Sequence, residues 1–195
     1  MRKIIITLLM ICVCANVLIA RNAKGFRNDL SIGAGYSYVT MNEQSISSPV
    51  INLQDFCIYD GGGSIIFDFD IAIPTSVGAG DISIGREFYD FLLGFEAVFG
   101  GGYNFAMDSL DLTLGGGVYY STFIARSGSS FGNDTYLGLG ILSRASYSFT
   151  DAFFAALTLR LGLPFVHFAE LNNVHDSIAG CGIAFKAHLG FGFRF

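Results

Sequence analysis

The sequence predicts an all-β fold: a single antiparallel eight-stranded transmembrane β-barrel, preceded by a cleavable signal peptide. The composition is 52% hydrophobic but only 14% charged, whereas soluble domains average about 25% charged residues. Twenty phenylalanines, nine tyrosines and twenty-five glycines against three prolines favour β-structure. Apolar residues also alternate with small or polar residues over most of the chain, which is the period of a strand with two unlike faces.

Residues 1–20 have the pattern of a signal peptide. Arg2 and Lys3 precede an apolar run from Ile4 to Ala20, which gives a charged region followed by a hydrophobic one. Cleavage after Ala20 would leave residues 21–195 as one barrel domain. The alternative is a retained membrane anchor, although the run is near the lower length limit for a spanning helix. No later stretch offers about 18 uninterrupted apolar residues, so helical spans are not expected.

Eight segments are predicted to be the strands of the barrel. The closing one, Ile183 to Phe195, is apolar at every second position and ends on an aromatic residue. The weakest is Ser76 to Arg86, where only Ile82 and Ile84 carry the apolar face. Accepting it gives an even number, as bacterial single-chain barrels require. The other six lie within residues 30–38, 59–71, 91–102, 110–120, 137–147 and 153–163.

The connections predict which end of the barrel faces which compartment. Short turns are expected at Pro74–Thr75, Asn104–Ser109 and Phe149–Asp151, and long polar loops at 41–56, 124–135 and 166–180. Short turns at one end and longer loops at the other are typical of outer-membrane barrels, with both termini on the periplasmic side. Aromatic residues near strand ends are expected to form interfacial girdles: Tyr36, Tyr103, Tyr119, Tyr120, Tyr136, Tyr147, Phe149 and Phe153.

A soluble barrel of the lipocalin type is the competing fold, because its strands alternate too. Such a barrel turns its apolar face inward and carries charges outside. In this chain, glycine, serine and alanine dominate the face opposite the apolar one, with few charges. That face fits a narrow lumen, in which side chains from eight strands share little space, and would make a poor solvated surface. The membrane barrel is therefore favoured.

Together, these features resemble the small eight-stranded bacterial outer-membrane β-barrel proteins, which include outer-membrane proteins X and W and the membrane domain of outer-membrane protein A. The signal-like segment, the alternating strands, the F-T-D turn at Phe149–Asp151 and the terminal Phe195 carry the resemblance. It implies a bacterial outer-membrane location and contact with outer-membrane lipid. It also implies that the barrel-assembly machinery reads the closing strand, through Phe191, Phe193 and Phe195.

Ten ionisable side chains should point into the lumen by strand parity, with acids on the earlier strands and bases on the later ones. Glu96, on the fourth predicted strand, is expected to face Lys186 on the eighth, at the depth of Arg160. Asp68 is expected to lie level with Arg144. Hydrogen-bonded pairs offset the cost of burying isolated charges. The full set is Asp60, Asp68, Asp70, Glu96, Asp111, Arg144, Arg160, Lys186, His188 and Arg194.

The cluster of Glu96, Arg160, Lys186, Asp68 and Arg144 is interpreted as a lumen plug or, alternatively, a salt-bridge gate. The favoured function is an outer-membrane barrel with a narrow, charge-plugged lumen. It would act structurally or through its surface loops, by adhesion or by binding a host or surface ligand. The alternative is a narrow pore or conduit for small solutes, including hydrophobic ones. Its apolar lining would come from inward-facing residues: Val39, Ile58, Ile66, Leu92 and Val98.

Other functional classes have less support. Sixteen acidic against eleven basic residues give no electrostatic basis for binding nucleic acid. A lipid A-modifying enzyme is a remote alternative. His175 and Ser177 have a His-x-Ser spacing, but in a predicted loop and with no glutamate downstream to orient the imidazole.

No cofactor or metal is expected. The glycine runs lack the Lys-Ser/Thr of a phosphate-binding loop, and the spacing of His167, Glu170 and His175 matches no defined metal site. Cys57 and Cys181 are expected near the outer ends of their strands, and a disulfide between them is left open.

Overall fold

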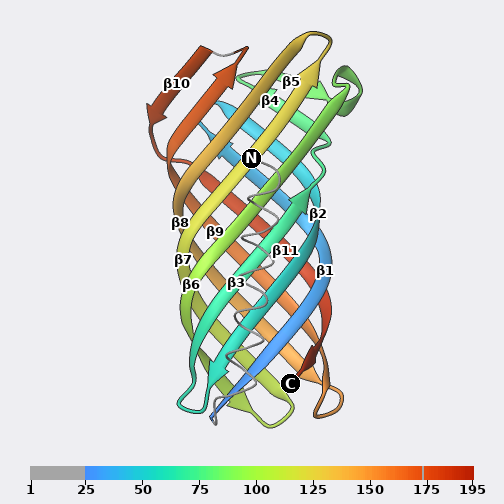
Figure 1. Cartoon of the computed structure of the whole chain (residues 1–195), viewed down its shortest axis with the longest axis vertical. Helices are drawn as coiled ribbons and strands as arrows, with labels where there is room; N and C mark the ends of the chain where they lie inside the picture. Colours follow the sequence, from blue (N-terminus) through green and yellow to red (C-terminus); the bar gives the residue numbers. More distant parts are fainter. Residues whose placement is uncertain (1–24, 173) are drawn as a thin grey trace.

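The computed structural model describes residues 25–172 and 174–195; the predicted signal peptide and its cleavage site lie outside them. The described chain forms a closed antiparallel barrel (Figure 1), in which β1 pairs with both β2 and β11. The ring order is β1-β11-β9-β8-β7-β6-β3-β2. The predicted eight-stranded barrel is confirmed. The ring strands are β1 (Phe26–Met41), β2 (Gln44–Tyr59), β3 (Gly63–Ala72), β6 (Phe91–Met107), β7 (Leu110–Ser127), β8 (Ser130–Ser148), β9 (Phe153–Leu171) and β11 (Ile183–Arg194).

The two ends of the barrel differ in their connections. At the lower end in Figure 1, the strands are joined by short turns at 60–62, 108–109 and 149–152, and β11 ends there. The upper end carries the remaining connections. A hairpin of β4 (Ser76–Ala79) and β5 (Ile82–Gly85), followed by a 3-10 turn at Arg86–Phe88, joins β3 to β6. Strand β10 (Val174–Ala179) pairs with the upper part of β9.

One of the eight predicted strands is wrong. Residues 44–59, most of which were expected in a polar loop, form β2, whereas residues 76–86 form the β4–β5 hairpin above the rim. The alternation of β2 is hidden because its inward positions include the polar Asn52 and Gln54 as well as Phe56. As a consequence, Pro74–Thr75 is a connection at the upper end, and β3 is the third strand of the ring.

The other predicted long loops are also largely strand. Residues 124–135 continue β7 and β8 into a hairpin whose turn is at 128–129, where Gly128 has φ +57°. Residues 166–180 are occupied mainly by the end of β9 and by β10. The upper end therefore consists of paired strands that extend past the barrel wall, because cross-strand hydrogen bonds continue beyond the predicted apolar segments.

The outer surface of the barrel is apolar. On β11, for example, Leu189 and Phe191 are 66% and 69% exposed. Exposed apolar side chains occur on every ring strand, which is the surface that a lipid bilayer covers. Around the lower rim, aromatic side chains touch in pairs, including Tyr147 with Phe149 and Phe193 with Phe195. Tyr119 and Tyr136 do not belong to a girdle as predicted, since both point inward and are buried. Within the described residues, no helix is long and apolar enough to cross a membrane.

Glycines on the inner face make room for large side chains. A β-carbon at Gly94 would lie 2.5 Å from the ring of Phe123 on the neighbouring strand, and one at Gly162 would lie 3.2 Å from the ring of Tyr119. The interior is therefore packed with side chains, as a barrel of eight strands requires.

Candidate functional site in the barrel lumen

Five charged side chains from four strands meet in the middle of the lumen, and they are here called the central network. Asp68 and Asp70 project from β3, Glu96 from β6, Arg160 from β9 and Lys186 from β11. None of the five is more than 1% exposed. Strand pairing holds them at one level, because Asp70 lies opposite Glu96 and Arg160 lies opposite Lys186.

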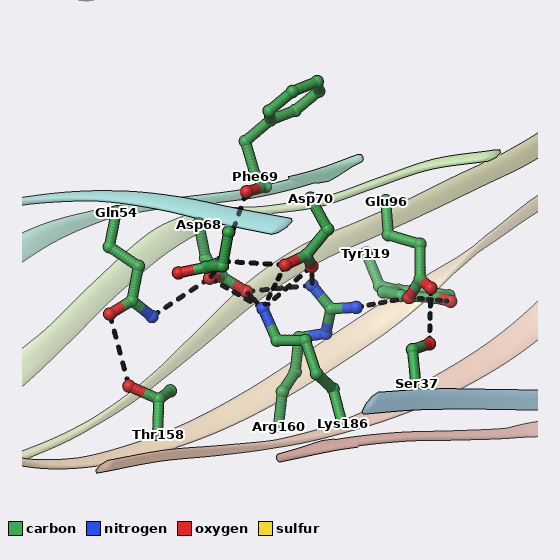
Figure 2. A network of polar contacts seen from close by, with 11 residues as sticks. Ser37, Gln54, Asp68, Phe69, Asp70, Glu96, Tyr119, Thr158, Arg160 and Lys186 are labelled. Carbon is green, nitrogen blue, oxygen red and sulfur yellow. Dashed lines mark hydrogen bonds and ion pairs between the residues drawn. The ribbon is translucent and has the colours of Figure 1, made fainter. Parts of the chain in front are cut away.

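The two bases of the central network bind carboxylates across the lumen, as Figure 2 shows. Lys186 Nζ donates to both oxygens of Asp68 and of Asp70 at 2.7–3.0 Å. Arg160 Nη1 donates to Asp68 Oδ2 at 2.9 Å and to Asp70 Oδ2 at 2.7 Å. Its other terminal nitrogen, Nη2, donates to Glu96. The two bases therefore connect all three carboxylates.

Two amide side chains of β2 complete the coordination of the aspartates. Asn52 Nδ2 donates to Asp68 Oδ1 at 2.7 Å and to Asp70 Oδ1 at 2.8 Å. Gln54 Nε2 donates to Asp68 Oδ1 at 3.0 Å, and its carbonyl accepts from Thr158 at 3.2 Å. Hydrogen bonds to the ionised form stabilise buried carboxylates, so the polar inner face of β2 is part of the site.

Glu96 has its own set of donors. Besides Arg160, the hydroxyl of Ser37 donates to Oε1, and the hydroxyl of Tyr119 donates to Oε2 at 3.3 Å. The guanidinium of Arg160 also lies 5.4 Å from the centre of the Tyr119 ring, within the range of a cation–π contact.

A second ionic cluster, here called the lower cluster, lies nearer the lower end and contains Arg27, Asp29, Asp111, Arg144 and Arg194. Arg194 binds Asp29 at 2.9 Å and Asp111 at 2.7 Å, and Arg27 binds Asp111 at 2.6 Å. Arg144 lies 3.5 Å from Asp29. The lower cluster has one more base than acid, and the central network has one more acid than base, so the two together are neutral when all ten groups are ionised.

Arg144 is held mainly by aromatic rings. Its guanidinium carbon lies 4.4 Å from the centre of the Phe56 ring and 4.8 Å from that of Phe154. The side chain is 1% exposed, and its nitrogens make no hydrogen bond within the described residues. Its charge is therefore balanced by Asp29 and by the two π-systems.

Apolar side chains flank the central network on both sides. On the upper side is a packed cluster that includes Val39, Val50, Ala72 and Phe123. On the lower side is a smaller cluster formed by Phe56, Ile58, Ile66 and Leu142. The central network therefore has buried apolar side chains on either side of it along the barrel.

A further polar group lies near the upper mouth. His167 Nε2 lies 2.9 Å from Asp134 Oδ1, and the imidazole stacks on Tyr136 with 4.6 Å between ring centres. The hydroxyl of Tyr136 donates to Gln44 at 3.1 Å.

The predicted inward direction is confirmed by burial for Asp68, Asp70, Glu96, Asp111, Arg144, Arg160, Lys186 and His188. It is confirmed for Arg194 by its contacts with the buried Asp29 and Asp111. Asp60 is the exception, because it lies exposed in the turn between β2 and β3. The predicted partners are wrong. Glu96 binds Arg160 rather than Lys186, which is occupied by the two aspartates, and Asp68 meets Arg160 and Lys186 rather than Arg144.

The error in the partner of Asp68 follows from the misplaced strand. With β2 in the ring, Asp68 is on the third strand, and the strand opposite is the seventh, which carries Arg160. Sequence reasoning also missed Arg27 and Asp29, because the first strand was expected to begin at Leu30. It missed Asn52 and Gln54 with β2 itself. The available signal was that Arg27 and Asp29 continue the period of two of Ser31 and Gly33.

The residues proposed to line an apolar conduit are all buried, as parity predicts: Val39, Ile58, Ile66, Leu92 and Val98. They do not form one pocket. Val39 and Val98 belong to the upper cluster, whereas Ile58 and Ile66 belong to the lower one, with the central network between them.

The His-x-Ser pair lies on a strand, not in a loop as expected. His175 is on β10, directly opposite Glu170 of β9, with Nδ1 4.0 Å from Oε2. A carboxylate therefore does face this imidazole, from an upstream position. No hydrogen bond joins Ser177 to His175 within the described residues, and the His175 side chain is 72% exposed. The geometry does not assemble an activated nucleophile.

The cysteines and the candidate metal ligands are dispersed. Cys57 is buried near the lower end of β2, and Cys181 is exposed between β10 and β11. Both are free, because they lie toward opposite ends of the barrel rather than both near the outer end as expected. Among residues 25–172 and 174–195, no group of three or more His, Cys, Asp or Glu side chains is arranged to hold a metal ion.

A closed ring of eight antiparallel strands, an apolar exterior and an ion-paired interior define a small transmembrane β-barrel protein. No protein-family model and no curated protein sequence matches the chain. Solved structures do match. Neisserial surface protein A is 13% identical, with 88% of this chain and 98% of that chain covered and a TM-score of 0.60. The outer membrane protein OprG from Pseudomonas aeruginosa is 10% identical, with coverages of 88% and 96% and a TM-score of 0.60.

Ail, the attachment invasion locus protein of Yersinia pestis, is 14% identical, with 89% of this chain and 100% of that chain covered and a TM-score of 0.56. At these identities, the likeness concerns the fold, and it confirms the predicted resemblance to small outer-membrane barrels at that level. The fold and the apolar exterior are those of a bacterial outer-membrane protein, which is the location that the sequence predicts.

Proposed function

We propose that this protein is an outer-membrane barrel with a closed lumen, which acts structurally or through its upper, extracellular end. The observation that carries this proposal is the central network. Its five charged side chains cross the lumen from opposite walls and are almost completely buried. A solute could pass only if these contacts broke, which would leave buried charges unpaired at a cost of several kcal/mol.

The apolar clusters support the same proposal. They lie above and below the central network, so a hydrated ion would have to shed its water at two further levels. The lower cluster and the contact between His167 and Asp134 add polar closures near the two mouths.

The orientation follows from the connections. Short turns and the C-terminus face the periplasm in outer-membrane barrels, and the longer segments face outward. The projecting hairpins of β4–β5, β7–β8 and β9–β10 would then be displayed at the cell surface. Ail, which shares the fold, is described as an attachment invasion locus protein. This supports a surface-interaction role in adhesion or ligand binding for the projecting strands.

Assembly is a separate part of the proposal. Phe191, Phe193 and Phe195 follow one another on the outward face at the end of the chain, and are 69%, 47% and 50% exposed. We propose that the barrel-assembly machinery recognises this aromatic end of β11.

A narrow pore is the second candidate, and one observation favours it. The central network has three carboxylates for two bases, so protonation or displacement of one carboxylate would leave equal numbers of positive and negative charges. Under this alternative, the network is a gate that opens when a contact is exchanged.

Planar-bilayer conductance separates the two candidates. The proposed plug predicts no steady conductance for the wild-type barrel, and none for Glu96→Gln, because the remaining pairs and the apolar clusters still close the lumen. A gate predicts conductance that changes in Glu96→Gln and in Lys186→Met while both variants stay folded. Steady wild-type channels would refute the closed lumen.

A further inference from the structure

Strand β10 has a free edge above the rim of the barrel. It pairs with residues 166–171 of β9 along one side, and each of its six residues is exposed. Below β10, the strand on the same side of β9 is β11. The other side of β11 is paired with β1, which ends at Met41. Among the described residues, no strand pairs with that side of β10, which lies at the outside of the upper end in Figure 1.

This edge is only lightly protected. Proteins protect exposed edges with short strands, charged side chains, proline or bulges; β10 is short and carries Asp176, but residues 174–179, V-H-D-S-I-A, contain neither proline nor lysine. The backbone N–H of Ser177 donates to the carboxylate of Asp176 at 2.8 Å. A neighbouring strand could take over that N–H, since the carboxylate is exposed and can turn back to water.

The surface beside the edge is hollowed and partly apolar. A hollow of 440 Å³ is lined by residues that include Phe168, Glu170, His175 and Ser177. Phe168 is 44% exposed. The hollow could receive side chains from a bound strand.

The charge of the upper end indicates what kind of chain fits there. Its connecting segments carry seven carboxylates against two arginines, Arg86 and Arg126, and no lysine. The carboxylates are Glu43, Asp81, Glu87, Asp90, Asp134, Glu170 and Asp176. Such a surface attracts cationic partners and repels a second copy of itself.

We propose that the free edge of β10 binds an extended polypeptide segment that carries lysine or arginine side chains, adding it as the next strand. The inference rests on the proposed function, in which the upper end acts at the cell surface. Main-chain hydrogen bonds to β10 supply affinity, as in other strand-addition complexes. Alternate side chains of the partner point to opposite faces of the sheet. Those on one face reach Asp176, and those on the other reach the hollow and Glu170. The two carboxylates supply the preference for basic residues.

The test uses the full barrel in detergent micelles and three fluorescent peptides of eight residues. One alternates lysine with threonine, the second has glutamate in place of lysine, and the third is the lysine peptide with alternate backbone amides methylated. We expect the first to bind and to weaken with salt, the second not to bind, and the third to bind at least about tenfold more weakly. Equal binding of the methylated peptide, binding of the glutamate peptide, or no binding by any of the three would overturn the proposal. So would barrel dimers linked through β10.

Two variants place the peptide on the edge. Ser177→Pro removes an N–H from the free side of β10, and should lower the affinity by about the same factor as methylation of the peptide. Asp176→Asn combined with Glu170→Gln should weaken binding and reduce its salt dependence. Asp81→Asn, in the β4–β5 turn, is the matched control away from the edge. An equal loss of affinity in this control would exclude β10 as the site.

The outcome is separable from the test of the closed lumen. A non-conducting barrel without peptide affinity would overturn this inference and leave the proposed function intact. A conducting barrel that binds the lysine peptide would do the reverse.

Discussion

At the scale of residues, the charged groups of the central network share their ion-pair partners. Lys186 and Arg160 both contact Asp68 and Asp70, so neither base can be lost without leaving negative charge uncompensated in a buried site. Removing one partner of a buried ion pair is more damaging than removing both. Glu96 differs from the aspartates because the network has one acid in excess.

The first prediction follows from this charge balance. Lys186→Met should lower the free energy of unfolding by about 3–5 kcal/mol, because three carboxylates then share one base. Glu96→Gln should cost much less, because the network becomes neutral and the amide keeps hydrogen-bond partners. Urea unfolding of the barrel in lipid vesicles, followed by tyrosine fluorescence, measures both.

Asp70→Asn added to Lys186→Met is the control for charge. The double variant should recover part of the stability lost in Lys186→Met, because it removes one of the unpaired acids. If the double variant is less stable than Lys186→Met alone, charge balance does not govern the network.

The inward direction of these residues could be predicted from parity, but their partners could not. Asp68 and Arg160 lie far apart in the sequence and meet only because they occupy strands on opposite sides of the ring. Which strand lies across the barrel depends on a strand's position in the ring. Because β2 was missed, Asp68 was assigned to the second strand instead of the third. Glu96 was correctly placed opposite Lys186, yet Lys186 binds the two aspartates, and Arg160 binds Glu96 instead.

At the scale of elements, the strands are recognisable where one face is apolar and the other is small. β11 and β9 satisfy this rule, and their central parts are predicted correctly. β2 does not, because Asn52, Gln54 and Ser48 share its buried inner face with apolar residues. Two of these polar residues, Asn52 and Gln54, also complete the central network.

A second prediction concerns packing between β6 and β7. Gly94→Ala should lower the free energy of unfolding by about 1–3 kcal/mol, because its β-carbon would lie 2.5 Å from the Phe123 ring. Phe123 also contacts Tyr136, so the ring cannot move freely. The same vesicle assay measures the effect.

Phe123→Leu in the Gly94→Ala background should restore part of the loss, because leucine vacates the space that the new methyl group needs. Gly61→Ala is the matched control, since nothing lies within 4 Å of a β-carbon there; its effect should stay within about 0.5 kcal/mol. Equal losses in Gly61→Ala and Gly94→Ala would contradict the packing account.

A third prediction concerns the end of β11. Phe195→Gln should reduce the amount of barrel in the outer membrane of cells, while the purified chain still refolds in detergent, because the aromatic end is proposed to be read during assembly. Phe149→Gln alters another exposed aromatic residue at the same end of the barrel and should have a smaller effect. Immunoblots of outer-membrane fractions measure this. Equal depletion by both variants would assign Phe195 a general anchoring role instead.

At the scale of the whole molecule, an apolar exterior surrounds a polar, ion-paired core. This arrangement, the inverse of a soluble protein, is stable only in lipid or detergent, because the exterior needs no water and the backbone groups of the ring pair between neighbouring strands. The composition alone predicts the inversion, since so few charges cannot cover a soluble surface of this size. The projecting strands of the upper end could not be predicted, because polar alternation outside the membrane resembles a loop.

A fourth prediction belongs to this scale. Protein from an outer-membrane fraction should migrate differently on a denaturing gel before and after boiling, because the closed hydrogen-bonded ring resists detergent at room temperature. Equal migration, or recovery of the protein in the soluble fraction, would rule out the membrane barrel.

Solute flux through proteoliposomes tests the closed lumen most directly. Vesicles loaded with the barrel, shown to be folded by its gel mobility, are placed in an isotonic solution of a small sugar, and swelling is followed by light scattering. The plugged lumen predicts swelling no faster than that of protein-free vesicles. Swelling that increases in proportion to the amount of folded wild-type barrel would show an open path through the central network and contradict the account.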